Sequence, residues 1–114
     1  MARETWIEVA LNGPWGQERQ SGSPIAVADI VEQAVACANA GAAILHLHAY
    51  DETTGRQRDD WQIYARIFEG IRSRADVSAY PTIPLAGASF TGQAESARAR
   101  YHHVEELAKR GLVE

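Results

Sequence analysis

The feature that most constrains the fold is a short apolar run, Ala42 to His48, which directly follows a helical pattern ending at Gly41. A nearly continuous apolar run in that position is typical of a parallel strand that is covered on both faces. Parallel strands need long crossover connections, which are usually helices. The run therefore predicts an α/β chain.

The same alternation of strand and helix runs through the whole sequence. We expect strands at residues 5–11, 42–48 and 77–82, and helices that begin near residues 27 and 59 and cover about residues 93–110. Residues 112–114 look like the start of another strand. The resulting β-α-β-α-β-α order predicts a parallel sheet with right-handed crossovers.

Helical periodicity and capping signals support these helices. The second helix carries an apolar stripe at helical spacing, and the third places Tyr101, Val104 and Leu107 inward; the stripe of the second is Trp61, Tyr64, Ile67, Phe68 and Ile71. Asp59 is the expected N-cap of the second helix, because Gln62 follows at capping-box spacing. The first helix has Ala26 where a capping side chain is expected, a lack that costs about 1 kcal/mol.

The composition excludes several classes of protein. Apolar residues make up 46% and charged residues 23% of the chain, as in globular proteins. The chain has 11 basic and 15 acidic side chains and a net charge of −4, so it lacks the excess of basic residues that is typical of nucleic-acid-binding proteins. No apolar run approaches the roughly 18 residues of a membrane-spanning helix. We therefore expect a cytoplasmic protein that binds neither nucleic acid nor membrane.

His46 and His48 are the most informative polar residues. They stand two positions apart at the carboxyl end of a predicted parallel strand, so both imidazoles point to the same face. Ligands of open α/β sheets and of barrels bind at that end of the strands. Two imidazoles supply two of the three protein ligands in many catalytic zinc sites. The alternative is that each histidine is an ordinary polar residue bonded to backbone or water.

Other candidate ligands are weaker. Glu8 lies on the first predicted strand, but three residues before its end, and the sequence leaves open whether it faces the histidines. His102 and His103 are adjacent on a helix and diverge by about 100°, so we expect them to be solvated. Trp6 is a candidate core residue, whereas Trp15 lies in a loop near the expected site.

Several segments carry a family resemblance in order and spacing along essentially the whole chain. The segments are Ala10-Leu11-Asn12-Gly13, residues 40–48 leading into Asp51, Thr54-Gly55-Arg56, and Ile63-Tyr64 before Ile71-Arg72. Together they resemble the β-keto acid cleavage enzymes, whose typical member is a 3-keto-5-aminohexanoate cleavage enzyme.

The resemblance implies a fold, a cofactor and a reaction. Members of the family are oligomeric zinc-dependent (β/α)₈ TIM barrels that exchange acyl groups between a β-keto acid and acetyl-CoA, giving acetoacetate and an acyl-CoA. The family's metal-binding histidines match His46 and His48, and the third ligand is a glutamate far downstream. We expect Asn12 and Thr82 to contact the substrate and the acid/base residues to lie beyond residue 114.

The chain departs from the family pattern at three places. Tyr50 stands where many members have an arginine before the aspartate. Trp15 replaces a glutamate that binds the substrate's amine in the aminohexanoate enzyme, which argues against an amino-substituted substrate. Residues 80–84 replace a Ser/Thr-Thr-Gly-Gly substrate loop, with Thr82 as the nearest match.

Length is the largest departure, because a (β/α)₈ barrel needs about 250 residues. We expect residues 1–114 to form one partial domain containing the first three βα units, and to be inactive alone. The sequence is then an N-terminal part of a longer homo-oligomeric enzyme. The alternative is a truncated, non-catalytic α/β remnant that oligomerises or binds metal weakly.

Overall fold

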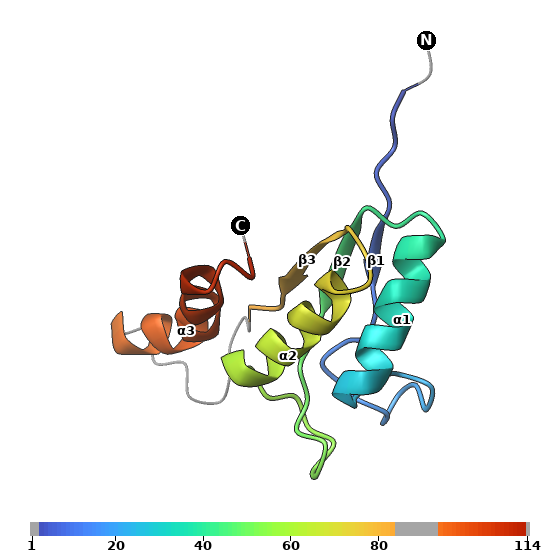
Figure 1. The fold of residues 1–114 in the computed structure, drawn as a ribbon. Coiled ribbons are helices and arrows are strands. Elements are labelled where there is room, and N and C mark those ends of the chain that lie inside the picture. Colours follow the sequence, from blue (N-terminus) through green and yellow to red (C-terminus); the bar gives the residue numbers. More distant parts are fainter. Residues whose placement is uncertain (1–2, 84–93, 114) are drawn as a thin grey trace.

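The computed structural model describes residues 3–83 and 94–113 and contains three strands that alternate with three helices (Figure 1). The elements in chain order are β1 (Glu8–Ala10), α1 (Val27–Asn39), β2 (Ile44–Leu47), α2 (Trp61–Arg72), β3 (Ser78–Pro81) and α3 (Ala94–Lys109). The predicted β-α-β-α-β-α order is confirmed. Gln93, where the third helix was expected to start, lies outside the described residues.

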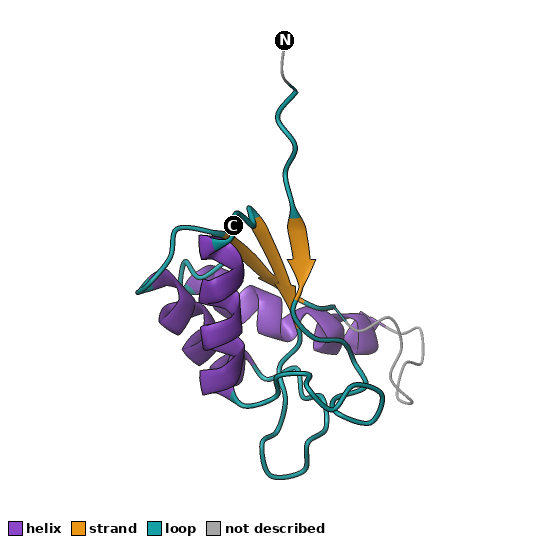
Figure 2. Ribbon diagram, turned by 90° about the vertical axis from the view of Figure 1, so that its right-hand side faces the viewer, coloured by secondary structure: helices purple, strands orange, loops and turns teal. Residues whose placement is uncertain are grey.

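The three strands form one parallel sheet in the order β1-β2-β3. In this register Ala10 lies opposite His46, and His46 lies opposite Tyr80. Because the strands are parallel, their carboxyl ends meet at one edge of the sheet, and the loops that follow β1 and β2 lie together there (Figure 2). The sheet is thus the α/β arrangement that the sequence predicts.

The core lies between the sheet and helices α1 and α2. Leu45 and Leu47 are fully buried on the helical face, while the alternate residues of β2 are only partly buried. Helical residues at the expected spacing complete this core; they are Ile30, Ala34, Tyr64, Ile67, Phe68 and Ile71. The opposite face of the sheet is more open, as the 42% exposure of Tyr80 illustrates.

The helix ends follow simple capping chemistry, with one correction. Asp60, and not Asp59, is the N-cap of α2, since its carboxylate accepts a hydrogen bond from the Gln62 backbone N–H at 2.8 Å. Ala26 gives α1 no side-chain cap, as expected. Instead, Glu52 reaches over from the loop after β2 and accepts from the Val27 N–H at 2.8 Å.

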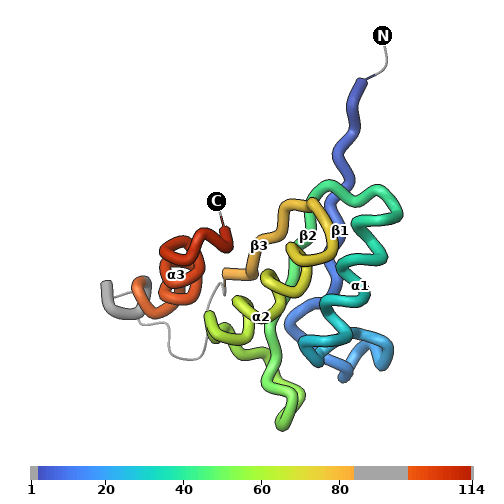
Figure 3. Tube along the Cα trace, in the orientation of Figure 1, coloured from blue at the N-terminus to red at the C-terminus, as the bar shows by residue number. Residues whose placement is uncertain are grey.

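The first strand is shorter than predicted. Residues 3–6 form an extended arm that projects away from the sheet at the end opposite the loops (Figure 3), whereas the Ile7 carbonyl accepts from the Ala43 and Ile44 N–H groups at 2.9 and 3.2 Å. Trp6 is 73% exposed, so its expected place in the core is wrong. The β-forming side chains of the arm favour an extended backbone, but pairing with β2 begins only near Glu8.

Helix α3 packs on α2, but its buried face differs from the predicted one. Tyr101 is exposed, whereas His103 is 1% exposed and stacks on the Tyr64 ring with centroids 5.5 Å apart. The expected solvation of His103 is therefore wrong. Its neighbour His102 is exposed, as expected from the divergence of adjacent helical positions.

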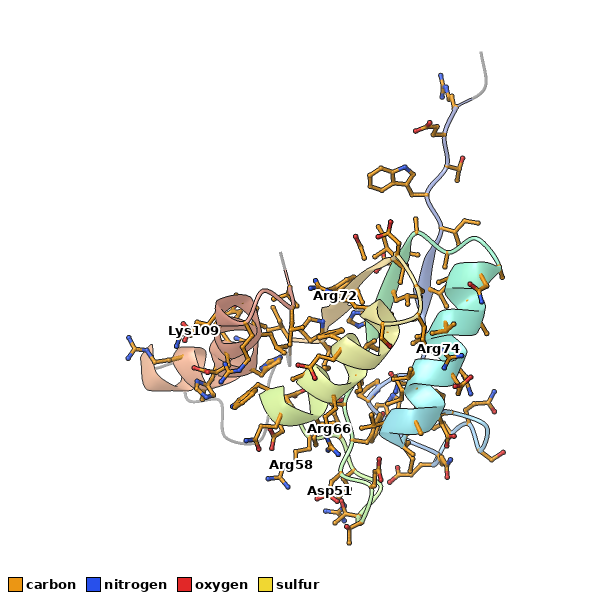
Figure 4. The ribbon with its side chains drawn as sticks, in the orientation of Figure 1. Asp51, Arg58, Arg66, Arg72, Arg74 and Lys109 are labelled. Carbon is orange, nitrogen blue, oxygen red and sulfur yellow. The ribbon has the colours of Figure 1, made fainter. Side chains whose placement is uncertain are left out.

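The chain after α3 returns to the end of α2 near the start of β3. The Arg72 guanidinium, labelled in Figure 4, donates to the carbonyls of Gly111 at 2.6 Å and Leu112 at 3.1 Å. Residues 112 and 113 are not in a strand, so the start of a fourth strand is not seen within the described residues.

None of the described helices combines the length and apolar character that a membrane crossing requires.

Candidate functional site

The two predicted ligands, His46 and His48, lie together at the carboxyl end of the central strand. Their ring centroids are 5.2 Å apart in an edge-to-face arrangement, which confirms that the rings are neighbours. The His46 ring also contacts Tyr80 on β3, with centroids 4.7 Å apart. The site is therefore built on the middle strand of the sheet, with β1 and β3 on either side.

His46 carries an unsatisfied polar atom. Its Nδ1 is buried and has no hydrogen-bond partner among the described residues. Burial and the adjacent His48 ring lower the pKa of His46, and the Glu8 carboxylate only partly offsets them. A neutral imidazole with an unpaired buried nitrogen is the form that binds a metal ion.

His48 is held through its backbone by Asn12, which follows β1. The Asn12 Oδ1 accepts from the His48 N–H at 2.8 Å, and the Asn12 Nδ2 donates to the His48 carbonyl at 3.1 Å. The same Nδ2 donates to the Pro24 carbonyl at 2.9 Å. Asn12 is 8% exposed, and its amide is fully engaged with backbone. Contact of Asn12 with a substrate stays a prediction.

The His48 ring is held by a second contact from the loop after β2. Its Nδ1 lies 2.9 Å from Gln57 Oε1. Gln57 Nε2 in turn donates to both carboxylate oxygens of Asp59, at 3.3 and 3.1 Å. His48 itself is 8% exposed, so the site holds this ring nearly out of solvent.

Thr82, the other predicted substrate contact, lies just beyond β3 at the same edge of the sheet. Its N–H donates to the Leu47 carbonyl at 3.0 Å, and its own carbonyl lies 2.8 Å from His103 Nε2. His103 thus contacts the backbone at the end of β3, a role that the sequence did not signal because His103 lies outside the predicted apolar stripe of the helix. Whether Thr82 binds a substrate is untested.

The structure resolves the orientation of Glu8. Its register partner is Ile44, and its carboxylate accepts a short hydrogen bond from the Tyr80 hydroxyl. Glu8 therefore shares the face of His46. However, no group of three or more metal-ligating side chains occurs in residues 3–83 and 94–113, so Glu8 does not complete a metal site with the two histidines.

Tyr50 joins two loops of the site. Its hydroxyl donates to the Gly13 carbonyl and accepts from the Gly16 N–H at 3.0 Å. Gly16 has φ +53°, and a Cβ there would lie 2.9 Å from the Gly55 carbonyl oxygen. Burial raises the pKa of Tyr50, so its hydroxyl stays protonated and able to donate.

These contacts suit the histidine pair to a divalent metal ion, although the described residues do not complete a ligand set. His46 offers an unpaired buried nitrogen, and His48 offers Nε2 because its Nδ1 is occupied by Gln57. A three-ligand zinc site with an open position needs one more protein ligand. Binding of a metal ion by His46 and His48 stays a prediction.

Comparison with known proteins gives the family. The family model described as beta-keto acid cleavage enzyme matches residues 4–111. A 3-dehydrocarnitine:acetyl-CoA trimethylamine transferase of Rhizobium meliloti (strain 1021) is 33% identical over 98 residues, which are 84% of this chain and 33% of that protein. A 3-oxoadipate:acetyl-CoA acetyltransferase of Cupriavidus necator is 37% identical over 78 residues, 66% of this chain and 26% of the relative.

The chain therefore spans about a third or less of the length of these relatives. The match to the family model nevertheless covers nearly all of the chain, including the histidine pair and both flanking strands. The chain belongs to the β-keto acid cleavage enzyme family.

Proposed function

We propose that this chain is the N-terminal part of a zinc-dependent enzyme that exchanges acyl groups between a β-keto acid and acetyl-CoA. The observation that carries the proposal is the pair of adjacent imidazoles at the carboxyl end of β2 in a member of this family. Both relatives are named for reactions with acetyl-CoA. The products of the proposed reaction are acetoacetate and an acyl-CoA.

The proposed architecture is a (β/α)₈ barrel to which residues 1–114 contribute the first three βα units. Parallel strands with one face covered by helices support this arrangement, because the other face of such strands lines a barrel interior. The third metal ligand and the acid/base residues then come from outside the described residues. We further propose that the complete enzyme is a cytoplasmic homo-oligomer.

The proposed roles of the residues follow from their contacts. His46 and His48 hold the zinc ion as neutral ligands. Zinc bound there supplies a Lewis acid for the carbonyl of the β-keto acid. Asn12 and Gln57 fix the backbone and the ring of His48. We also propose that Thr82, at the end of the adjacent strand, and Asn12, at the same end of the sheet, contact the substrate.

Replacement of a ligand tests the proposal directly. His46→Ala in the intact polypeptide is expected to abolish retention of zinc, measured by elemental analysis of the purified protein. The matched control is His102→Ala, since His102 is an exposed histidine on α3. Unchanged zinc content in His46→Ala would show that the metal is bound elsewhere.

A second candidate is a truncated α/β remnant without enzyme activity. It is favoured by the lack of a third ligand near the histidines among the described residues. The intact mass of the native polypeptide separates the two candidates. A mass of roughly 30 kDa with one zinc per chain supports the barrel enzyme, whereas 12.5 kDa without zinc supports the remnant.

A further inference from the structure

Gln57 connects His48 to the carboxylate of Asp59, and this connection selects one form of the His48 ring. The side chain lies between the two groups, with Oε1 2.9 Å from His48 Nδ1 and Nε2 3.1 Å from the nearer oxygen of Asp59. A neutral imidazole has one protonated and one unprotonated nitrogen, and the hydrogen bonds around it decide which is which.

The direction of these hydrogen bonds follows from the chemistry of the carboxylate. An ionised carboxylate only accepts hydrogen bonds, so Gln57 must turn its NH₂ group toward Asp59. The amide oxygen of Gln57 then faces His48, and an oxygen can only accept. His48 Nδ1 must therefore carry the proton, which leaves the lone pair of Nε2 free.

Asp59 and Gln57 are each held in place by a further contact. The Tyr64 hydroxyl donates to Asp59 Oδ1 at 3.0 Å, and Tyr64 is fully buried on α2. Burial, followed by the charge of Asp59, raises the pKa of Tyr64, so this hydroxyl remains a donor. The backbone of Gln57 pairs with Tyr50 in an antiparallel bridge. The fold thus fixes Tyr64 and Gln57 as the two hydrogen-bond donors to the Asp59 carboxylate.

We propose that Gln57 and Asp59 are positioning residues that hold His48 with its proton on Nδ1 and so present Nε2 to the metal. The inference rests on the proposed function for the identity of the ligand. It concerns residues of the loop after β2 that do not themselves bind the metal. Residues that orient a ligating histidine typically change metal affinity by 10–100-fold when they are replaced.

The first test needs no substitution and no metal. Long-range ¹H–¹⁵N correlation spectra of the intact, zinc-free polypeptide distinguish the protonated from the unprotonated ring nitrogen when the ring is neutral. The expected result is a proton on Nδ1 of His48. A proton on Nε2 in the wild-type protein would overturn the proposal.

Two variants then reverse and restore the pattern of donors. In Asp59→Asn, the new side-chain oxygen accepts from Tyr64 and its NH₂ faces Gln57, so the Gln57 amide turns and donates to His48 Nδ1. The His48 proton is then expected on Nε2, with zinc affinity about 10–100-fold weaker. In the double variant Gln57→Glu/Asp59→Asn, the new carboxylate accepts from both neighbours and returns the proton to Nδ1.

The matched control is Asp76→Asn, because Asp76 is an exposed aspartate in the turn before β3. Zinc affinity, measured by competition with a chromophoric chelator, is expected to be unchanged in the control and recovered in the double variant. Loss of affinity in Asp59→Asn without recovery in the double variant would reduce Asp59 to a merely structural residue and overturn the proposal.

The two proposals fail in different ways. A proton on Nδ1 in a protein that binds no zinc would contradict the proposed function while leaving the arrangement of Gln57 and Asp59 established. Zinc binding that requires His46 but is the same in wild type and Asp59→Asn would support the proposed function and contradict the role of Asp59.

Discussion

The side chain of Asn12 extends the hydrogen bonding of the sheet beyond the point where the β1 backbone stops pairing with β2. The ladder between β1 and β2 extends as far as the Leu11 N–H, which donates to the His46 carbonyl at 3.0 Å. Beyond that point, the amide of Asn12 takes over both the N–H and the carbonyl of His48. A side-chain amide carries the same donor and acceptor as a peptide group, so it replaces the missing strand.

This arrangement makes Asn12 important for stability. Asn12→Ala leaves the buried backbone groups of His48 and the Pro24 carbonyl without these partners. The free energy of unfolding is expected to fall by about 1–3 kcal/mol. Urea unfolding of the intact polypeptide measures the loss, with Asn39→Ala at the exposed end of α1 as the control. A loss no larger than that of the control, which is expected to stay within about 0.5 kcal/mol, would contradict the argument.

The sequence predicts the histidine pair but not the residues that support it. His46 and His48 follow from strand periodicity, because residues two apart share a face of any strand. Gln57 reaches His48 only because the loop after β2 folds back and pairs Tyr50 with Gln57. Helix or strand periodicity in the sequence does not predict that a loop folds back in this way. Asp59 carried a signal, but its spacing from Gln62 favoured a cap, and the adjacent Asp60 took that role.

At the scale of the elements, helices α1 and α2 approach closely at a glycine. A Cβ at Gly70 would lie 2.9 Å from Cγ2 and 3.3 Å from Cγ1 of Val31. Real Cβ contacts are not that short, so the helices pack at their present distance because position 70 has no side chain. Valine has few alternative rotamers in a helix, which limits its ability to move away.

Gly70→Ala is therefore expected to destabilise the protein despite its better helix propensity. Overpacking costs about 1–3 kcal/mol, and replacing a helical glycine by alanine returns about 1 kcal/mol. In a Val31→Ala background the clash disappears, and the same change is expected to stabilise. A double-mutant cycle measured by urea unfolding gives the coupling energy. Additive effects of the two changes would refute the proposed contact.

The buried face of a helix is predictable where the apolar periodicity is strong. The prediction fails for a helix whose buried face also includes a polar residue. Four residues of the α2 stripe are buried as their spacing predicts, and Trp61 at its start is only partly buried; the four are Tyr64, Ile67, Phe68 and Ile71. The stripe of α3 is less reliable, because Tyr101 is exposed and His103 takes its place in the buried face. Burial of His103 depends on two distant partners, the Tyr64 ring and the Thr82 carbonyl, which lie on other elements.

At the scale of the whole molecule, the sheet has one covered and one open face. The strand residues on the helical face are buried or partly buried, whereas Tyr80 and Glu8 lie on the opposite face and are exposed. Several large apolar side chains are also exposed elsewhere on the described residues, among them Trp6, Ile7 and Ile83. Exposed apolar patches and unpaired strand edges both favour association.

The 114-residue chain expressed alone is consequently expected to self-associate. Sedimentation velocity over a range of concentrations would then give a mass that rises with concentration and exceeds 12.5 kDa. The alternative outcome is a monomer at all concentrations that unfolds in one sharp transition, and it would contradict this expectation.

The alternation of elements predicts the parallel sheet, but closure of the proposed barrel depends on more strands than the three that the structure describes. The observed order β1-β2-β3 follows the tendency of consecutive strands to lie side by side. The curvature of a closed barrel depends on tilt and stagger shared by all of its strands. The three βα units therefore predict only the surroundings of the two histidines. The rest of the proposed site is inferred from the family resemblance.

The hydroxyl of Tyr50, which joins Gly13 and Gly16 across the two loops of the site, also has a kinetic meaning. Tyr50 is separated from these glycines by 37 and 34 residues, so its two hydrogen bonds form only after the ends of a long loop have met and the entropy of closing that loop has been lost. The backbone of His48 depends on Asn12 across the same two segments. We therefore expect the two loops to open and close as one cooperative unit, and the ring of His48 to be organised only while that unit is closed.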